Sequence, residues 1–158
     1  MRQLSGAMLG LLVVLAGMQG AHAQQRASGD AHRSAVQNAE RTPPSRRTER
    51  QHLALGQAHY SAGRLDEAAQ AADAAIKRNP ASAEGWRIRG DVARERGDWP
   101  AALKAYERAT RSDPRRADLE LLRGQALMEL GREREADQAF ARYRSLQHMQ
   151  VVPAGDGK

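Results

Sequence analysis

Two histidines are the side chains whose spacing first suggests chemistry. His52 and His59 are seven residues apart, which places both on one face of a helix and raises the possibility of metal binding. A metal site needs three or four convergent ligands, and no Asp, Glu or further His nearby completes a set. We therefore interpret both histidines as packing residues and predict no metal site.

Acidic and basic residues are numerous, but they alternate along the chain, as in Glu133/Arg134 and Arg94/Glu95. Pairs at helical spacing solubilise a surface and contribute roughly a few tenths of a kcal/mol each. The sequence has no Ser/His/Asp order, glycine-rich phosphate loop or HExxH motif. It also has no cysteine, which excludes disulfides, thiolate metal ligands and a cysteine nucleophile. We predict that the protein is not an enzyme and uses no cofactor and no small-molecule substrate.

Small residues recur at a fixed spacing, and this recurrence indicates how the helices of the chain are arranged. The spacing is 34 residues for two sets, Gly56, Gly90 and Gly124, and Ala68, Ala102 and Ala136. The same phase carries Pro80, Tyr106, Pro114 and Phe140. A period of about 20 to 50 residues indicates a repeat array. A mid-helix glycine costs ~1 kcal/mol against alanine, so we expect another backbone to pass close to it, with the alanines facing it from a second helix.

Capping and turn signals divide each copy into two helices. Thr48-x-x-Gln51 is a capping box, Ser82 and Asp98 are further N-caps, and Gly63 and Gly97 suit the turn between helices. Helices are expected over residues 49–61, 65–78, 118–130 and 133–148, and the middle copy repeats this arrangement.

The middle copy reads Trp86-x-x-Arg89-Gly90, then Gly97, Ala102, Tyr106, Ala109 and Pro114. It resembles the tetratricopeptide repeat, a 34-residue helix–turn–helix unit. The resemblance covers residues 49–150 as repeats 49–82, 83–116 and 117–150. The outer copies depart from the pattern: His52 and His59 stand at usual aromatic positions, Glu120 where Trp is common and His148 where Pro is common. The resemblance implies an all-α fold, an α-solenoid of three repeats in a right-handed superhelical stack.

The resemblance also implies that the first helix of each copy lines a groove that binds a protein or peptide. The groove positions fall on Leu53, Gln57, Tyr60, Arg87, Asp91, Arg94, Leu121, Gln125 and Met128. This mixture suggests a short peptide held by apolar contacts at its ends and charged groups in its middle, and the alternative is an ordinary solvated face. Chaperone-tail binders of the family carry a Lys, Asn and Arg clamp for a terminal carboxylate. Those positions here hold Leu53, Gln57, Asp91, Asp118 and Leu122, so that clamp is absent.

Residues 1–23 are similar to a secretory signal peptide. Arg2 supplies the positive start, residues 7–18 form a short apolar run, and Ala21-His22-Ala23 fits the cleavage pattern. The run is too short to cross a bilayer of ~30 Å comfortably, although an uncleaved anchor stays an alternative. We expect export to a bacterial periplasm with cleavage near Ala23/Gln24, and no lipoprotein because no cysteine follows.

The segments that flank the repeats are expected to lack structure. Residues 24–48 are polar, with five arginines against Asp30 and Glu40, and they are predicted to be a disordered basic linker. Residues 151–158 are predicted to be a flexible tail. With no further solvating helix, the C-terminal end would expose an apolar surface for self-association, formed by Phe140, Tyr143, Leu146 and Met149.

These features predict a scaffold or adaptor that binds a partner protein or peptide, in envelope, secretion or pilus assembly. In the alternative, the arginine-rich N-terminal tail binds an anionic polymer or lipid. The net charge of +6 is spread over the tail and the first two copies, so a nucleic-acid partner is not expected. Aromatic residues make up only 4% of the chain, and the core must therefore be built from alanine and leucine.

Overall fold

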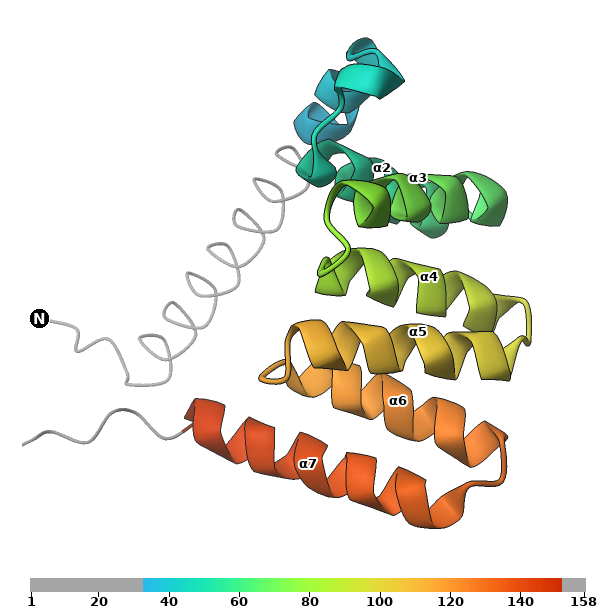
Figure 1. Ribbon diagram of the computed structural model, residues 1–158, viewed down its shortest axis with the longest axis vertical. Coiled ribbons are helices and arrows are strands. Elements are labelled where there is room, and N and C mark those ends of the chain that lie inside the picture. The colour runs from blue at the N-terminus through green and yellow to red at the C-terminus, as the bar shows by residue number, and fades with distance from the viewer. Residues whose placement is uncertain (1–32, 152–158) are drawn as a thin grey trace, which may run out of the picture.

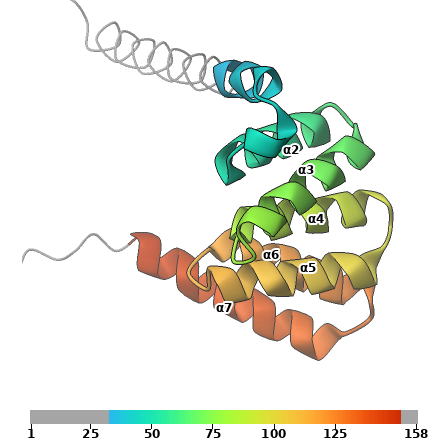
Figure 2. The same cartoon turned by 45° about the horizontal axis from the view of Figure 1, so that its top comes forward.

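The computed structural model describes residues 33–151, and every regular element within that range is helical. Residues 33–41 form a short helix. The rest of the order is η1 (Pro44–Arg46), α2 (Glu49–Ser61), α3 (Leu65–Arg78), α4 (Ala83–Glu95), α5 (Trp99–Ser112), α6 (Ala117–Glu129) and α7 (Glu133–Val151). Figures 1 and 2 show three hairpins stacked along one axis, with residues 33–41 at one end and α7 at the other. The prediction of an all-α solenoid of three helix–turn–helix repeats is confirmed.

Local signals set the helix ends as the sequence predicts. The Thr48 hydroxyl accepts from the Gln51 N–H (3.3 Å), and the Gln51 side chain accepts from the Thr48 N–H (2.9 Å), which completes the capping box. Ser82 and Asp98 cap α4 and α5 through their side-chain oxygens. The turn inside each of the three hairpins uses a glycine with a φ near 70°, a left-handed conformation that favours glycine, at Gly63, Gly97 and Gly131. Because these signals act within a few residues, sequence reading places them well.

The repeated small residues sit at the helix contacts, although not quite as predicted. Ala68, Ala102 and Ala136 are fully buried. A Cβ at Gly124 would lie 2.5 Å from Phe140 Cε1, and a Cβ at Gly90 would overlap the Tyr106 ring. An aromatic ring, and not a passing backbone, therefore excludes a side chain at these two positions.

In the first copy, a different neighbour limits the space for a side chain at the mid-helix glycine. Ala72 stands at the position that Tyr106 occupies one repeat later, so no ring covers Gly56. The nearest atom to a Cβ at Gly56 is Ile88 Cδ1 of the next repeat, at 3.3 Å. A side chain of the second hairpin thus packs against Gly56 of the first, as expected of a repeat array in which a single hairpin cannot bury its own apolar face.

Residues 33–48, part of the segment predicted to be a disordered linker, pack against the first hairpin in the structure. Ala39 is fully buried in a cluster with Leu55 and Ala71. Arg47 Nε donates to the carbonyl oxygens of Ala39 (2.8 Å) and Thr42 (2.9 Å). The Ala39 methyl group and the hydrogen bonds of Arg47 hold this segment against α2 and α3. Neither residue raises the hydropathy of the segment, so hydropathy does not indicate this packing. Residues 24–32, the signal-like residues 1–23 and residues 152–158 lie outside the described range.

The C-terminal end of the stack is less apolar than predicted. The Phe140 ring packs into the core that joins α4 to α7, and Tyr143 and Leu146 are half-buried. Met149, 64% exposed, is the large apolar side chain that α7 presents to solvent. The exposed positions of α7 include Arg134, Asp137, Gln138 and Arg144, so this helix solvates the end itself. Self-association through this end stays a prediction. Over residues 33–151, none of the helices combines the length and hydropathy needed to cross a membrane.

Candidate binding surface on the first helices

The nine predicted groove residues lie on the first helix of each hairpin, and we call them the first-helix surface. Leu53, Gln57 and Tyr60 come from α2, Arg87, Asp91 and Arg94 from α4, and Leu121, Gln125 and Met128 from α6. Helix α2 contacts α4 directly as well as through α3, and two hydrogen bonds join side chains of the two rows. The structure therefore brings the α2 and α4 rows together.

Arg87 is the centre of this surface. Its Nη2 donates to Gln57 Oε1 across the repeat boundary (2.8 Å) and to Glu84 Oε1 (2.6 Å). Its Nε donates to Glu84 Oε2 (3.1 Å), and its Nη1 lies 2.5 Å from Asp91 Oδ2. Hydrogen bonds to Glu84 are the main reason that the pKa of Arg87 is raised. Four of the five guanidinium N–H groups are thus used within the protein, and Arg87 has little capacity left for a ligand.

Asp91 is only 3% exposed, so it does not present a carboxylate to a partner. Its Oδ1 accepts a hydrogen bond from the hydroxyl of Tyr106 on α5 (2.9 Å). Burial raises the pKa of Asp91 above its ordinary value, against the opposing effects of Arg87 and Tyr106. Burial also raises the pKa of Tyr106, and the Asp91 carboxylate adds to this effect. Asp91 therefore holds Arg87 and Tyr106 in place, and we remove it from the predicted ligand contacts.

The network continues to the third repeat through residues that sequence reasoning missed. Arg116, just before α6, donates to Glu84 Oε2 (2.9 Å) and lies 2.5 Å from Asp118 Oδ2. Burial by itself would raise the pKa of Glu84, but hydrogen bonds from Arg87 and Arg116 hold it below its ordinary value. The i, i+3 spacing of Glu84 and Arg87 is a signal that could have found the first of these pairs.

Arg94 is the more exposed of the two arginines on this surface. Its Nη2 donates to Tyr60 Oη (3.0 Å), and the Tyr60 hydroxyl donates to Glu95 Oε1 (2.9 Å). The Arg94 side chain is 33% exposed, and its Nη2 also lies 3.3 Å from Glu95 Oε1. Its buried Nε has no hydrogen-bond partner among residues 33–151. Burial is the main reason that the pKa of Tyr60 is raised, so the phenol stays neutral.

The α6 row is uncharged, with Gln125 between two apolar residues, and it is not hydrogen-bonded to the α4 row. Leu121 is half-buried, Gln125 is exposed and Met128 is 48% exposed. Within the described range, no hydrogen bond or ion pair involves any of these three side chains. The surface thus passes from a charged, hydrogen-bonded part on α2 and α4 to an apolar part on α6.

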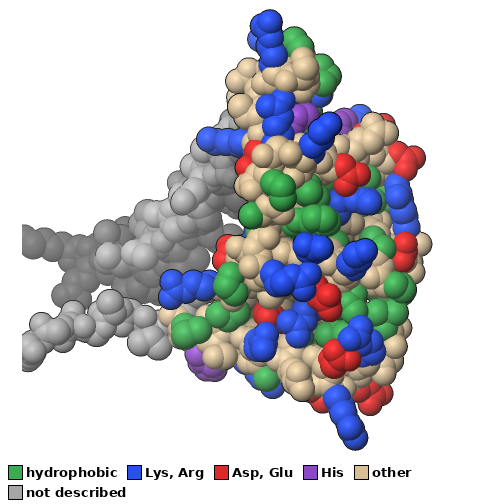
Figure 3. Space-filling view, viewed as in Figure 1, with side chains coloured by type: hydrophobic (Ala, Val, Ile, Leu, Met, Phe, Trp, Pro, Cys, Tyr) green, Lys and Arg blue, Asp and Glu red, His purple; other side chains and the backbone are tan. Residues whose placement is uncertain are grey.

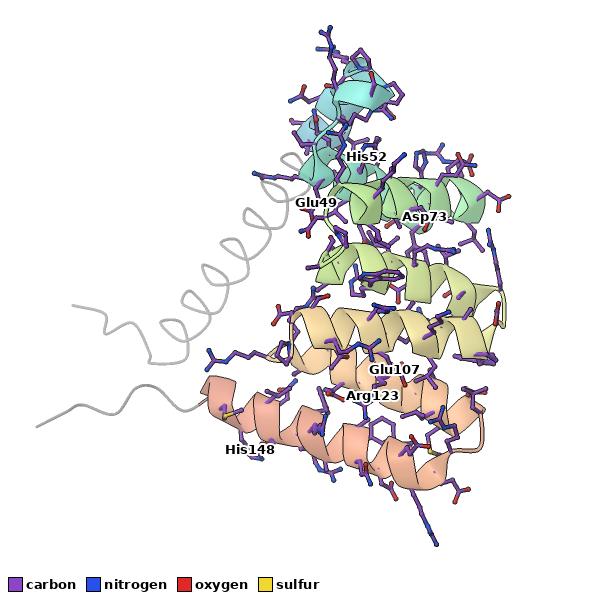
Figure 4. All side chains as sticks on the ribbon, in the orientation of Figure 1. Glu49, His52, Asp73, Glu107, Arg123 and His148 are labelled. Carbon is purple, nitrogen blue, oxygen red and sulfur yellow. The ribbon has the colours of Figure 1, made fainter. Side chains whose placement is uncertain are left out.

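Neither His52 nor His59 belongs to a cluster of potential metal ligands in the described range. His52 is 6% exposed, and burial together with the nearby Arg47 and Arg78 lowers its pKa. His59 Nδ1 accepts from Arg64 Nε (3.1 Å). Figure 4 shows His52 and His148 at opposite ends of the stack. Among the described residues, no three His, Asp or Glu side chains converge as metal ligands would.

Comparisons with known proteins agree with this architecture. A family model described as Tetratricopeptide repeat matches residues 53–103 and again residues 89–147. The crystal structure of MamA is similar, with a TM-score of 0.63 and 22% identity over 66% of this chain and 61% of that chain. A thermophilic TPR protein in Thermus thermophilus gives a TM-score of 0.62 and 20% identity over 78% of this chain and 70% of its own. At these identities the two structures support the fold alone.

One curated protein is similar in sequence. Peroxisome biogenesis protein 5 of Arabidopsis thaliana is 42% identical over 67 residues, which is 42% of this chain. The aligned part is only 9% of the Arabidopsis protein, so most of that protein has no counterpart in the match. The family model spans more than half of the chain and the hairpins stack as its repeats require. The chain belongs to the tetratricopeptide repeat family.

Proposed function

We propose that the protein is a non-catalytic scaffold that binds a peptide segment of a partner protein on the first-helix surface. Proteins built from this repeat are generally scaffolds of this kind, and concave repeat surfaces provide extended binding sites. The proposal rests on the arrangement of Gln57 and Arg94, whose side chains are oriented by hydrogen bonds with Arg87 and Tyr60.

Gln57 is the observation that carries the proposal. Its Oε1 is occupied by Arg87 Nη2 at 2.8 Å, so the side-chain amide is fixed in orientation and its NH₂ group is directed away from Arg87. An amide NH₂ has two donors, which suit the carbonyl oxygens of an extended peptide. Ordering the amide in advance also reduces the entropy lost when a peptide binds.

Charge and hydropathy define the chemistry of the peptide. Arg87 is balanced by Glu84 and Asp91, whereas Arg94 is 33% exposed and pairs with Glu95, which is itself 47% exposed. We therefore expect an acidic side chain of the peptide beside Arg94. An apolar side chain would lie on the α6 row, where Met128 is exposed.

The test is an array of short peptides probed with the full-length protein and with Arg94→Glu. We expect Arg94→Glu to lose peptides that contain Asp or Glu and to leave circular dichroism unchanged. Lys104→Glu makes the same charge change on an exposed position of α5 and is the matched control, which should keep the wild-type pattern. If both variants bind the wild-type set, the first-helix surface is not the binding site. Arg87→Glu is unsuitable, because it would remove the ion-pair partner that Glu84 shares with the buried Asp91, whereas Arg94 is paired with Glu95, which is 47% exposed.

The arginine-rich segment supports a second candidate, contact with an anionic polymer or lipid. Arg41 and Arg46 have exposed side chains on the segment that precedes α2. Deleting the segment would uncover Leu55, so Arg41→Gln with Arg46→Gln is the cleaner perturbation. If this pair of changes abolishes binding and Arg94→Glu does not, the segment and not the first-helix surface makes the main contact. Such binding should also weaken steeply with salt, because exposed charges are screened over about 8 Å at physiological ionic strength.

We further propose that the partner is met in the bacterial envelope, in secretion or pilus assembly, after export. This part of the proposal rests on residues 1–23. Mass spectrometry of the protein released from the periplasm should give a chain that begins at Gln24. An intact chain that stays in the cytoplasm would contradict it.

A further inference from the structure

A pocket with a volume of about 620 Å³ opens between α5 and α7, and residues of α6 also line it. Its walls include Pro114, Glu120, Arg123, Arg142 and Leu146, and none of the nine residues of the first-helix surface lines it. Small-molecule pockets typically measure about 300 to 1,000 Å³. Figure 4 labels Arg123 and Glu107 at this place, and Figure 3 shows lysine and arginine side chains gathered over α5 and towards α7. The pocket is therefore separate from the proposed peptide surface, and its test does not depend on that proposal.

Glu120 at the base of the pocket is an unusual buried acid. Its side chain is 3% exposed, and buried charges are costly unless they are paired and hydrogen-bonded. Arg123 Nη1 lies 3.0 Å from Oε2, but the hydrogen bond from this nitrogen is to Oε1 (3.3 Å). Oε2 is a buried atom and has no hydrogen-bond donor among residues 33–151. A ligand with an N–H group could supply that donor.

The preceding repeat shows what fills the equivalent space. Pro80, Trp86 and Arg108 become Pro114, Glu120 and Arg142 after a shift of 34 residues. Trp86 Nε1 donates to the Pro80 carbonyl oxygen at 2.9 Å. Arg108 Cζ lies 5.9 Å from the centroid of the Trp86 ring. The second repeat thus places its own indole between the proline and the arginine, whereas the third repeat has a carboxylate there and an open pocket.

We propose that this pocket binds an aromatic ring bearing an N–H donor, an indole above all, in the position that Trp86 fills in the preceding repeat. The ring would lie beside Pro114 and Leu146, under the Arg142 guanidinium, with its N–H directed at Glu120 Oε2. The source of the indole is either a tryptophan side chain of a partner protein or a free indole compound.

The charges around the pocket match the charge distribution of such a ring. An aromatic ring has a negative face and a positive edge. Arg142, whose side chain is 68% exposed and whose Nη1 lies 3.7 Å from Glu120 Oε1, can cover the face. Cation–π contact with arginine is favourable within about 6 Å of the ring centroid. Glu120 meets the positive edge, where the indole N–H also lies.

An anion fits the pocket less well, although Arg111 and Arg142 lie at its mouth. A phosphate or carboxylate that entered would approach the buried Glu120 carboxylate, and like charges at short distance repel. Arg123 is already paired with Glu120 and is not free to offset that repulsion.

The experiment is a titration of the full-length protein with indole and with N-methylindole, followed by amide chemical shifts and by calorimetry. We expect saturable indole binding with shift changes at Glu120 and Arg142. N-methylindole should bind about tenfold more weakly, because a hydrogen bond to a charged acceptor contributes at least this factor. Glu120→Trp should abolish binding by filling the pocket with the chain's own indole.

Two further variants keep the test decisive if Glu120→Trp does not fold. Arg142→Ala changes an exposed side chain and should weaken indole binding about threefold, the scale of an exposed cation–π contact. Arg108→Ala removes the equivalent arginine over Trp86 and should leave indole binding unchanged. Equal binding of indole and N-methylindole would overturn the proposal, and so would displacement of indole by inorganic phosphate or no indole binding at all.

The two sources of the ring are separated by a short peptide, acetyl-Ala-Trp-Ala-amide, and its Trp→Ala counterpart. A tryptophan peptide that binds at least as tightly as indole supports a protein ligand. Binding of indole without the peptide supports a free indole compound. Binding of the Trp→Ala peptide as tight as that of the tryptophan peptide contradicts a ring-specific pocket.

Discussion

Tyr106→Phe should destabilise the protein by removing one hydroxyl from the buried network that supports the first-helix surface. The ring is fully buried, and its hydroxyl donates to Asp91 Oδ1 at 2.9 Å. Phenylalanine keeps the ring over Gly90, so packing is preserved and only the hydrogen bond is lost. A hydrogen bond to a charged group contributes about 1.5–3 kcal/mol, and the acceptor left behind is buried. We therefore expect a loss of about 2 kcal/mol in the free energy of unfolding at neutral pH.

Urea denaturation followed by circular dichroism measures this loss. With an m value of about 2 kcal/mol per molar, the midpoint should fall by about 1 M. Tyr143→Phe is the matched control, because the Tyr143 hydroxyl accepts from the exposed Gln147 side chain (3.1 Å). Its loss should stay within about 0.5 kcal/mol, as for other surface changes.

The pH dependence of the Tyr106→Phe loss tests the reasoning further. The folded-state pKa of Asp91 is above its ordinary value of 3.8, so ionised Asp91 lowers stability as the pH rises through the folded pKa. The Tyr106 hydroxyl stabilises the ionised form, and its removal should therefore cost more at about pH 7 than at about pH 4. A loss below about 0.5 kcal/mol, or the same loss at both pH values, would refute the role given to this hydrogen bond.

Three other changes test the packing and the histidine. Gly124→Ala should lower the free energy of unfolding by about 1–3 kcal/mol, because the new Cβ overlaps the Phe140 ring. Gly56→Ala, whose Cβ meets no atom closer than 3.3 Å, should cost less in the same urea titration. Equal effects would contradict the conclusion that the ring excludes a side chain at Gly124. Burial lowers the pKa of His52. The contribution of this histidine to stability is therefore complete above its ordinary pKa of 6.5 and is lost as the pH falls below that value. His52→Trp should flatten the profile of thermal stability against pH between about pH 5 and 7, and an unchanged slope would show that other groups cause the pH dependence. Ala39→Gln should expose residues 33–48 to proteolysis, because Ala39 is fully buried and the longer polar side chain has no space there. Unchanged resistance to proteolysis would mean that the packing of this segment does not depend on Ala39.

The sequence by itself determined the repeat, its helices and their ends. The 34-residue period, the Thr48 capping box and the turn glycines act through neighbours within a few residues or through strict recurrence, and both can be read without coordinates. The predicted bounds of α2 and α3 match the structure. Helix α6 begins and ends one residue earlier than predicted, and α7 runs to Val151.

Only the tertiary structure decided which polar side chains are exposed and which are internal. Asp91 occupies a groove position in the repeat pattern, yet its carboxylate is buried because Tyr106 and Arg87 hold it from two sides. Glu120 departs from the pattern in sequence, but a pocket beside it follows only from how α5 and α7 pack over α6. Arg87 and Asp91 are only four residues apart, but the burial of the carboxylate and the hydrogen bond from Tyr106 arise from contacts about one helix apart and depend on how the hairpins stack. Local sequence signals contain no information about that stacking, and for this reason the fold could be predicted further than the site.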